Sequence, residues 1–465
     1  MKILKYLVVF LFVSLVSLPV FNLFASGDAG EVGGHTAFAS TFLWIAVILI
    51  FAKVASLVEK VGQPAVLGEL VMGVVLGNLG LLGIHFLDPI GTDSIIAFLA
   101  ELGVVVLLFQ IGLESNITEM RKVGAKAFIV AVIGVVVPFL LGTYLIGPWL
   151  LPDFAFITHL FVGATLTATS VGITARVFKD LGTLNSKESQ IVLGAAVIDD
   201  VLGLIILAVV SAIATVGAVG FGLIGWITAK AVLFLVGAIV IGQFGAPYVG
   251  KALSKIHTGH GMKFTFAISF GLLLAYLAHL IGLAPIIGAF AAGLVLDAVH
   301  FKTFRNPKIA TEIDEIAEKL PEEPKGLLQK ISHEFSHKHV EDLIEPLSFF
   351  LVPIFFLMTG FNVKLESLFS GEVLLLALII TVVAIIGKVV AGLGAGKVNK
   401  LLVGFGMVPR GEVGLIFVMI GRSLGVVSDQ LFSAIVVMVI LTTLCTPPIL
   451  TYLIKKEKNK SLAQA

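Results

Sequence analysis

Two adjacent aspartates, Asp199 and Asp200, lie inside an apolar run, residues 191–207, that is long enough to span a bilayer. A carboxylate at bilayer depth costs about 3 kcal/mol or more, so it is rarely present without a use. Two carboxylates in succession require a partner, a proton or a bound cation. The pair therefore predicts a cation or proton site within a membrane.

Two other segments carry residues that weaken a helix and offer oxygen atoms at comparable positions. The first contains Thr165, Thr167, Thr169 and Ser170, and the second contains Pro409, Arg410, Gly411 and Glu412. Proline removes a helix hydrogen bond and glycine permits other backbone angles. We predict a helix break in the membrane at each place, with Thr167 and Thr169 beside the two aspartates as cation-binding or proton-binding residues. The alternatives are ordinary helix packing for the first segment and a re-entrant cytoplasmic end with a snorkelling Arg410 for the second.

The charged residues have similar estimated depths within the membrane. A helix rise of roughly 1.5 Å per residue, counted from the nearest basic helix ends, puts Asp199 and Asp200 roughly 18–20 Å deep. Thr167 and Lys388 then lie about 13 Å deep and Arg410 about 15 Å deep, in an apolar core about 30 Å thick. Adjacent helical residues diverge by about 100°, so the two aspartates have different tasks. We assign Asp199 to an ion pair with Lys388 and Asp200 to the transported ion, although geometry alone permits the opposite.

Composition indicates a polytopic membrane protein. Of the 465 residues, 58% are hydrophobic and 13% are charged, whereas a soluble domain has about a quarter charged. A net charge of +1 gives no field for nucleic acid, and one cysteine excludes an intrachain disulfide. We predict an all-α protein with thirteen transmembrane helices, centred near residues 49, 74, 104, 136, 167, 201, 235, 271, 293, 353, 384, 412 and 442. No cofactor is predicted.

The flanking and loop segments predict the orientation. Basic residues such as Lys122, Lys187 and Lys400 fall in alternate loops, which predicts an outside N-terminus and a cytoplasmic C-terminus. Residues 1–26 resemble a signal peptide, with an uncleaved helix as the alternative. Residues 455–465 form a basic cytoplasmic tail.

One polar loop differs from the others. Residues 302–344 read as a charged cytoplasmic insertion of helix-favouring sequence. It holds His333, His337 and His339 at near-helical spacing. We interpret these histidines as a solvated face, and the alternative is a pH-sensing or metal-binding patch, since histidine titrates near neutrality.

An inverted internal repeat is visible in the glycine spacing. The members of each matching pair lie on helices offset by seven in the chain order, and an odd offset reverses orientation across the membrane. The pairs are Gly68 and Gly288, Gly73 and Gly293, and Gly112 and Gly360. Helices one to six and eight to thirteen therefore read as inverted halves joined by helix seven. This is a secondary-transporter architecture with crossed broken helices at the midplane.

Together these residues resemble the bacterial sodium/proton antiporters of the NapA type, in the second monovalent cation:proton antiporter family. The resemblance covers residues 38–455 and rests on the aspartate pair, the Thr/Ser break, Lys388 and the 409–412 segment. It implies a homodimer in the cell (inner) membrane with a dimerisation domain and a six-helix core that moves by elevator-like alternating access. Asp200 would bind Na⁺ (or Li⁺) and H⁺ in turn, and the Asp199–Lys388 pair would open as the cation arrives.

Several alternatives stay open at this point. Potassium/proton antiporters of the Kef type usually carry a nucleotide-binding domain and a Gln at the first Asp position, whereas this sequence has Asp199 and reaches Ala465 without such a domain. Both points favour Na⁺. A cation channel is a more distant alternative. An intramembrane aspartyl protease, which would make the protein an enzyme, needs two converging carboxylates, whereas adjacent helical residues diverge.

Overall fold

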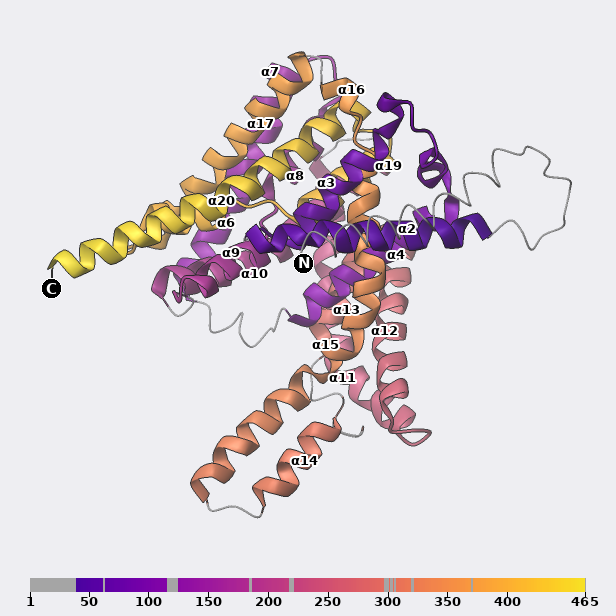
Figure 1. Ribbon diagram of the computed structural model, residues 1–465, viewed down its shortest axis with the longest axis vertical. Helices are drawn as coiled ribbons and strands as arrows, with labels where there is room; N and C mark the ends of the chain where they lie inside the picture. Colours follow the sequence, from indigo (N-terminus) through magenta and orange to yellow (C-terminus); the bar gives the residue numbers. More distant parts are fainter. Residues whose placement is uncertain are drawn as a thin grey trace, which may run out of the picture. The chain divides into compact units, whose positions relative to one another are not determined.

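The computed structural model describes residues 39–464 except for 62, 115–123, 184–185, 217–220, 297–300, 302–303, 305–306, 319–321 and 369–370. The predicted signal-like segment 1–26 lies outside the described residues. The chain divides into a first unit, Met1–Ala46, and a second, Val47–Ala465. The first unit is described only from Ala39, where α2 begins, and all elements after α2 belong to the second unit (Figure 1).

Every regular element in the described residues is helical, as predicted. The elements before the aspartate pair are α2 (Ala39–Ala55), η1 (Ser56–Val61), α3 (Ala65–Gly77), η2 (Leu79–Leu82), η3 (Asp88–Thr92), α4 (Ser94–Glu114), α6 (Ala125–Leu140), η4 (Leu141–Ile146), α7 (Gly147–Leu150), α8 (Phe156–Thr167) and α9 (Val171–Asp180). The others are α10 (Lys187–Val216), α11 (Phe221–Ser254), α12 (His260–Leu280), α13 (Pro285–Val295), α14 (Lys308–Ala317), α15 (Glu322–Phe361), α16 (Leu365–Leu368), α17 (Gly371–Val389), η6 (Val390–Ala395), α18 (Lys400–Gly406), α19 (Glu412–Ser423) and α20 (Asp429–Gln464).

Helix length identifies some of the membrane spans but not all of them. Eight of the described helices are long and apolar enough to cross a membrane, and α11 makes a ninth if its two bent parts count as one span. Four further apolar helices are shorter: α3, α8, α13 and most of α19. Each of the thirteen predicted centres falls on a described helix, with those at 167 and 412 beside a break. The count of thirteen stays a prediction, because breaks and short helices interrupt the length criterion.

The helices of the second unit pack as two groups. We call α3, α4, α12, α13 and α15 the scaffold helices, since they pack mainly on one another. We call α6, α8, α9, α10, α17, α18, α19 and α20 the core helices for the same reason. Helix α11 contacts both α10 and α13. The aspartate pair and Lys388 lie on core helices, α10 and α17.

Corresponding glycines bring the scaffold helices into close contact. A Cβ added at Gly73 of α3 would overlap a carbonyl oxygen of α15, and one at Gly360 of α15 would overlap a carbonyl oxygen of α3. The same reciprocal contact joins Gly293 of α13 to Gly112 of α4. Small residues let helix backbones approach this closely in membranes. The glycines that match in sequence therefore make matching contacts in space.

These contacts predict a large steric effect at Gly360. We expect Gly360→Ala to lower the unfolding free energy by about 1–3 kcal/mol, because the new methyl group would collide with the Leu70 carbonyl. The measurement is thermal unfolding of the detergent-purified protein. Gly326→Ala on the same helix is the matched control, since nothing lies within 4 Å of its added Cβ. Equal melting temperatures for the two variants would contradict the predicted close contact.

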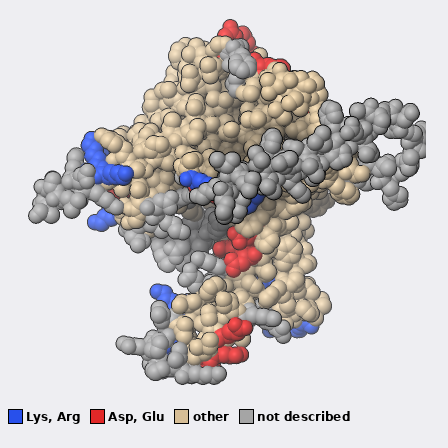
Figure 2. Space-filling model, viewed as in Figure 1, with Lys and Arg blue, Asp and Glu red and all other residues tan. Residues whose placement is uncertain are grey.

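The 302–344 insertion is a helical hairpin continuous with a membrane helix. Helix α14 packs against the first part of α15, with the Ser332 hydroxyl donating to the Ala310 carbonyl at 3.2 Å. Helix α15 then runs unbroken into the apolar segment His339–Phe361. Figure 2 shows acidic and basic side chains over this hairpin, and a broad uncharged surface over α17. The charge contrast fits a polar segment outside a bilayer and apolar helices within it.

The histidine prediction for this insertion is wrong in one respect. His339 is buried, its Nδ1 lies 2.9 Å from Lys263 Nζ, and its ring contacts the His260 ring at 4.8 Å. It faces α12 because α15 packs on that helix, so it is not part of a solvated face. The side chains of His333 and His337 lie outside the described residues. Among described residues no cluster of three or more His, Cys, Asp or Glu could hold a metal ion.

Candidate functional site

Both predicted helix breaks are present and lie against each other. Helix α8 ends at Thr167 and α9 begins at Val171, while α18 ends at Gly406 and α19 begins at Glu412. The backbone between them is extended at Ala168 (φ −60°, ψ 145°) and non-helical at Gly411. The Ser170 amide donates to the Pro409 carbonyl at 2.8 Å, which joins the two breaks directly. Helix ends with unpaired carbonyls and amides therefore meet inside the core helices.

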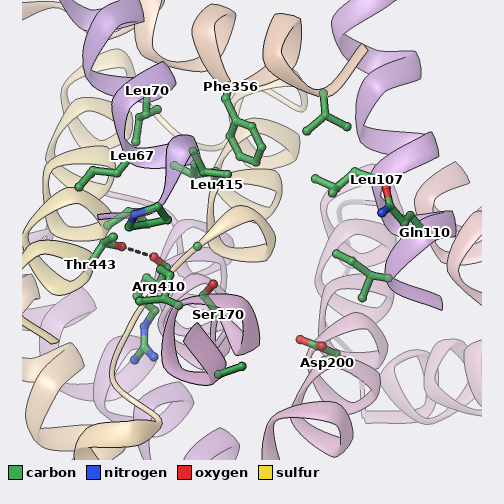
Figure 3. A pocket seen from close by; sticks show the side chains of 18 of the residues that line it. Leu67, Leu70, Leu107, Gln110, Ser170, Asp200, Phe356, Arg410, Leu415 and Thr443 are labelled. Atoms are coloured by element: carbon green, nitrogen blue, oxygen red, sulfur yellow. Dashed lines mark hydrogen bonds between the residues drawn. The ribbon is translucent and has the colours of Figure 1, made fainter. Parts of the chain in front are cut away.

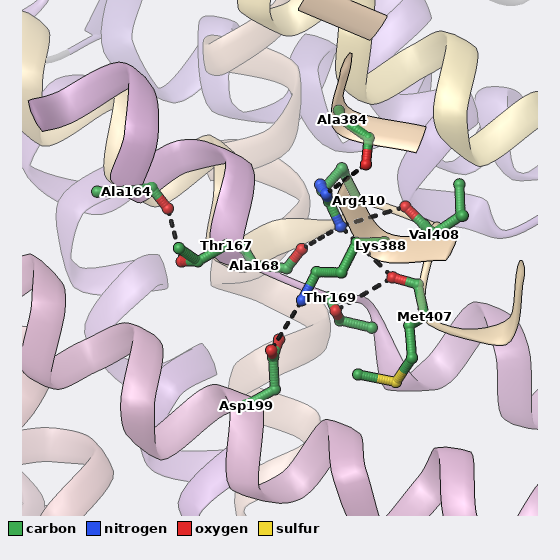
Figure 4. A network of polar contacts seen from close by, with 10 residues as sticks. All are labelled: Ala164, Thr167, Ala168, Thr169, Asp199, Ala384, Lys388, Met407, Val408 and Arg410. Carbon is green, nitrogen blue, oxygen red and sulfur yellow. Dashed lines mark hydrogen bonds and ion pairs between the residues drawn. The ribbon is translucent and has the colours of Figure 1, made fainter. Parts of the chain in front are cut away.

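The Arg410 side chain binds these exposed carbonyls. It is fully buried, and Nη1 donates to the Ala168 carbonyl at 2.7 Å while Nη2 donates to the Ala384 carbonyl at 3.2 Å (Figure 4). Nη1 also lies within 3.4 Å of the carbonyls of Met407 and Val408. Arg410 therefore does not snorkel to a surface. Its charge lies at the C-terminal ends of α8 and α18, where the helix dipoles are negative.

Asp199 and Lys388 form a buried ion pair between α10 and α17. Lys388 Nζ lies 2.8 Å from Asp199 Oδ1, and neither side chain is exposed. Figure 4 shows the pair directly below the contacts made by Arg410. A buried charge without a partner is strongly unfavourable, so each member of the pair stabilises the other.

Asp200 points to a different place, a cavity of about 490 Å³. Scaffold helices α3, α4 and α15 line one side of the cavity, and the two breaks with core helices α9, α10, α19 and α20 line the other. Figure 3 shows the Asp200 carboxylate directed into this space, with Ser170 on the same side. The two adjacent aspartates therefore have separate environments, an ion pair for Asp199 and a cavity for Asp200.

The predicted hydroxyl residues are divided between several partners. The hydroxyls of Thr165 and Thr167 donate within α8, to Phe161 at 2.8 Å and to Ala164 at 2.7 Å, and neither side chain lines the cavity. The Thr169 hydroxyl donates across the breaks to Met407 at 3.2 Å. A hydroxyl that donates one hydrogen bond keeps its oxygen lone pairs for other partners.

One predicted site residue has no described side chain, and three polar residues at the site were not predicted from the sequence. Glu412 begins α19, but its side chain lies outside the described residues. Sequence reasoning missed Thr443, whose hydroxyl donates to the Arg410 carbonyl at 2.6 Å, and Thr174, which donates to Gly406 at 2.7 Å. It also missed Gln110, which lines the cavity. Uncharged polar residues in an apolar helix are common, so only their depth could have singled them out.

Comparison with known proteins places this arrangement in a family. The chain is 36% identical to the high-affinity Na⁺/H⁺ antiporter NhaS3 of Synechocystis sp., with 91% of each protein covered. It is 33% identical to the Na⁺/H⁺-K⁺ antiporter GerN of Bacillus cereus, covering 88% of this chain and 95% of GerN. The solved structure of the sodium proton antiporter MjNhaP1 from Methanocaldococcus jannaschii has the same fold, with a TM-score of 0.61 at 16% identity, covering 89% of this chain and 96% of that one.

The family model described as the transmembrane sodium/hydrogen exchanger matches residues 43–322 and 325–456. These two ranges contain both helix breaks, the aspartate pair and Lys388. The resemblance to sodium/proton antiporters is thereby confirmed, and the chain belongs to the sodium/hydrogen exchanger family of membrane proteins.

Proposed function

We propose that this protein exchanges Na⁺ (or Li⁺) for H⁺ across a membrane, with Asp200 as the residue that binds each ion in turn. The observation that carries the proposal is the division of the aspartate pair. Asp199 is held by Lys388, whereas Asp200 faces a cavity that an ion can occupy. The antiporter names of the similar proteins support the same activity.

The exchange follows from the charge of one carboxyl group. A protonated Asp200 is neutral, and an ionised Asp200 with a bound monovalent cation is also neutral as a unit. An empty ionised carboxylate at bilayer depth is the costly state, so the site crosses best with either a proton or a cation. Because both ligands need the same oxygens, binding of one releases the other. Thr167 ends α8 and Thr169 lies within the break, and both are proposed as supporting ligands.

We propose that alternating access comes from movement of the core helices against the scaffold helices. The cavity lies between these two groups, and the joined breaks belong wholly to the core. The matching glycine contacts support the inverted halves, helices one to six and eight to thirteen, in a thirteen-span arrangement. An outside N-terminus, a cytoplasmic C-terminus and a homodimer in the lipid bilayer complete the proposal. On cation arrival the Asp199–Lys388 pair opens.

A second candidate is potassium/proton exchange. One similar protein is named a Na⁺/H⁺-K⁺ antiporter, so K⁺ is the competing cation. The site itself supplies a carboxylate, hydroxyls and carbonyl groups, which are ligands for any hard cation. Protease chemistry is disfavoured, because Asp199 is engaged with Lys388 and does not converge with Asp200.

The deciding experiment measures proton flux in proteoliposomes. Purified protein is reconstituted with a pH-sensitive dye inside, and NaCl, LiCl or KCl is added outside, with and without a potassium–valinomycin clamp for the sodium and lithium arms. We expect Na⁺ and Li⁺ to drive proton movement in the opposite direction, with K⁺ weaker. Cation flux without proton movement would indicate a channel, and no response to any cation would overturn the proposal.

A further inference from the structure

The two sides of the cavity differ in chemistry. The core side presents the Asp200 carboxylate and Ser170. The scaffold side is lined by apolar residues such as Leu67, Leu70 and Phe356. Among the described residues that line this side, Gln110 alone carries a polar side chain. A cation between the two sides would therefore meet oxygen ligands on the core and mainly hydrocarbon on the scaffold.

Gln110 is placed to supply an oxygen from the scaffold. Leu107, Gln110 and Ile111 line the cavity at positions i, i+3 and i+4, so they share one face of α4. Gln110 on α4 and Asp200 on α10 both line this cavity, and Figure 3 shows them at different parts of its wall. The residue as a whole is only partly buried, and it lines the cavity.

Loss of hydration is the cost that such an oxygen offsets. Na⁺ is a hard cation that prefers oxygen ligands, and an apolar wall cannot replace the water molecules it displaces. The Gln110 amide carries a carbonyl oxygen with two lone pairs and no charge. It can bind a cation without forming a permanent ion pair, so the cation can still leave.

We propose that Gln110 is a cation-binding residue of the scaffold. Its amide oxygen contacts the cation held at Asp200 and sets the affinity and selectivity of the site. This inference rests on the exchange proposed above and deepens it. It assigns to α4 a direct part in recognition of the cation.

The internal repeat adds a directional consequence. Alignment of Gly112 with Gly360 places Met358 of α15 at the position that corresponds to Gln110 of α4. A thioether sulfur is a weak acceptor and a poor ligand for a hard cation. If the two halves exchange roles between access states, the extra oxygen is present in only one of them. The cation affinity would then differ between the two membrane faces.

The test removes the amide oxygen of Gln110 while keeping the volume of the side chain nearly the same. We expect Gln110→Leu to raise the apparent KM for Na⁺ about tenfold in proteoliposomes, because one contact to a charged group is lost. The maximal rate should stay within about twofold, since the carboxylate that carries the proton is untouched. Gln430→Leu, at an exposed position on α20, is the matched control and should keep the wild-type KM.

A second variant and a second measurement keep the inference testable. Gln110→Glu replaces the amide with a carboxylate, which keeps one oxygen, adds a second and adds charge, so its apparent KM for Na⁺ should fall below that of the wild type. Stabilisation of the detergent-purified protein by NaCl should weaken in Gln110→Leu and strengthen in Gln110→Glu, independently of transport. Wild-type KM values in both variants would overturn the role of Gln110 and leave the exchange activity standing. Absence of exchange in the wild type would overturn the proposed function itself.

Discussion

Asp200→Asn is expected to abolish cation/proton exchange. Asparagine has nearly the same shape, so packing around the cavity is kept, but the side chain can neither bind a proton nor carry a charge. Loss of a charged partner in a desolvated site costs several kcal/mol, which corresponds to at least roughly a hundredfold loss of exchange rate. The measurement is Na⁺-driven proton flux in proteoliposomes at equal protein content.

Two comparisons make the Asp200 result interpretable. Asp153→Asn, on an exposed turn outside the cavity, should keep the wild-type rate. NaCl should raise the melting temperature of the wild type and of Asp153→Asn but not that of Asp200→Asn, since binding stabilises only a protein that binds. Sodium-dependent proton flux that persists in Asp200→Asn would show that another group carries the proton.

The charged part of the site could be predicted from the sequence because charge at membrane depth is expensive. Asp199, Asp200 and Lys388 stood out against apolar neighbours, and helix rise alone put them at one depth. The structure joins Lys388 to Asp199 and turns Asp200 toward the cavity. Helical geometry required that the two aspartates diverge, but the choice between them depended on family resemblance. Whether Asp200 binds the ion stays a prediction.

The uncharged part of the site was much less predictable. Thr165 and Thr167 were expected at the break, yet both hydroxyls donate to carbonyls of their own helix, as threonine often does in apolar helices. Arg410 was placed at the right break, but its partners are the carbonyls of Ala168 in the other break, of Ala384 on α17 and of its own segment, which only the tertiary fold brings together. The sequence did not indicate Gln110 as a site residue, because a single amide side chain in an apolar helix has many ordinary explanations.

The helical membrane fold could be predicted from the sequence, but the number of continuous spans and the packing of individual residues could not. Composition required membrane helices, and the glycine pairs indicated an inverted repeat, whereas the helices that these glycines contact became visible only in the structure. The breaks and short helices, however, leave eight or nine continuous spans by length, so a simple window cannot count the rest. His339 shows a second limit. Its polar surroundings in sequence suggested solvent, but packing of α15 on α12 buries it beside Lys263.

Lys388→Gln is expected to remove the response of exchange to membrane potential. In the proposed mechanism the Asp199–Lys388 pair opens as the cation binds. We add to that proposal that the released Lys388 gives up a proton. Two protons would move per Na⁺, which makes exchange electrogenic. Without Lys388 at most one proton moves per cation, so transport becomes electroneutral or stops. The measurement is the initial rate of proton flux under imposed potentials, with Lys251→Gln on the exposed face of α11 as the control.

The ion pair also contributes to stability, and a double variant separates the two effects. Because both side chains are fully buried, Lys388→Gln leaves an uncompensated Asp199 carboxylate and should lower the unfolding free energy by about 3–5 kcal/mol. Asp199→Asn combined with Lys388→Gln removes both charges and should recover most of that loss. It should not restore the response to potential, because the lysine proton is still absent. Potential-driven exchange at the wild-type rate in either variant would contradict the assigned role of Lys388.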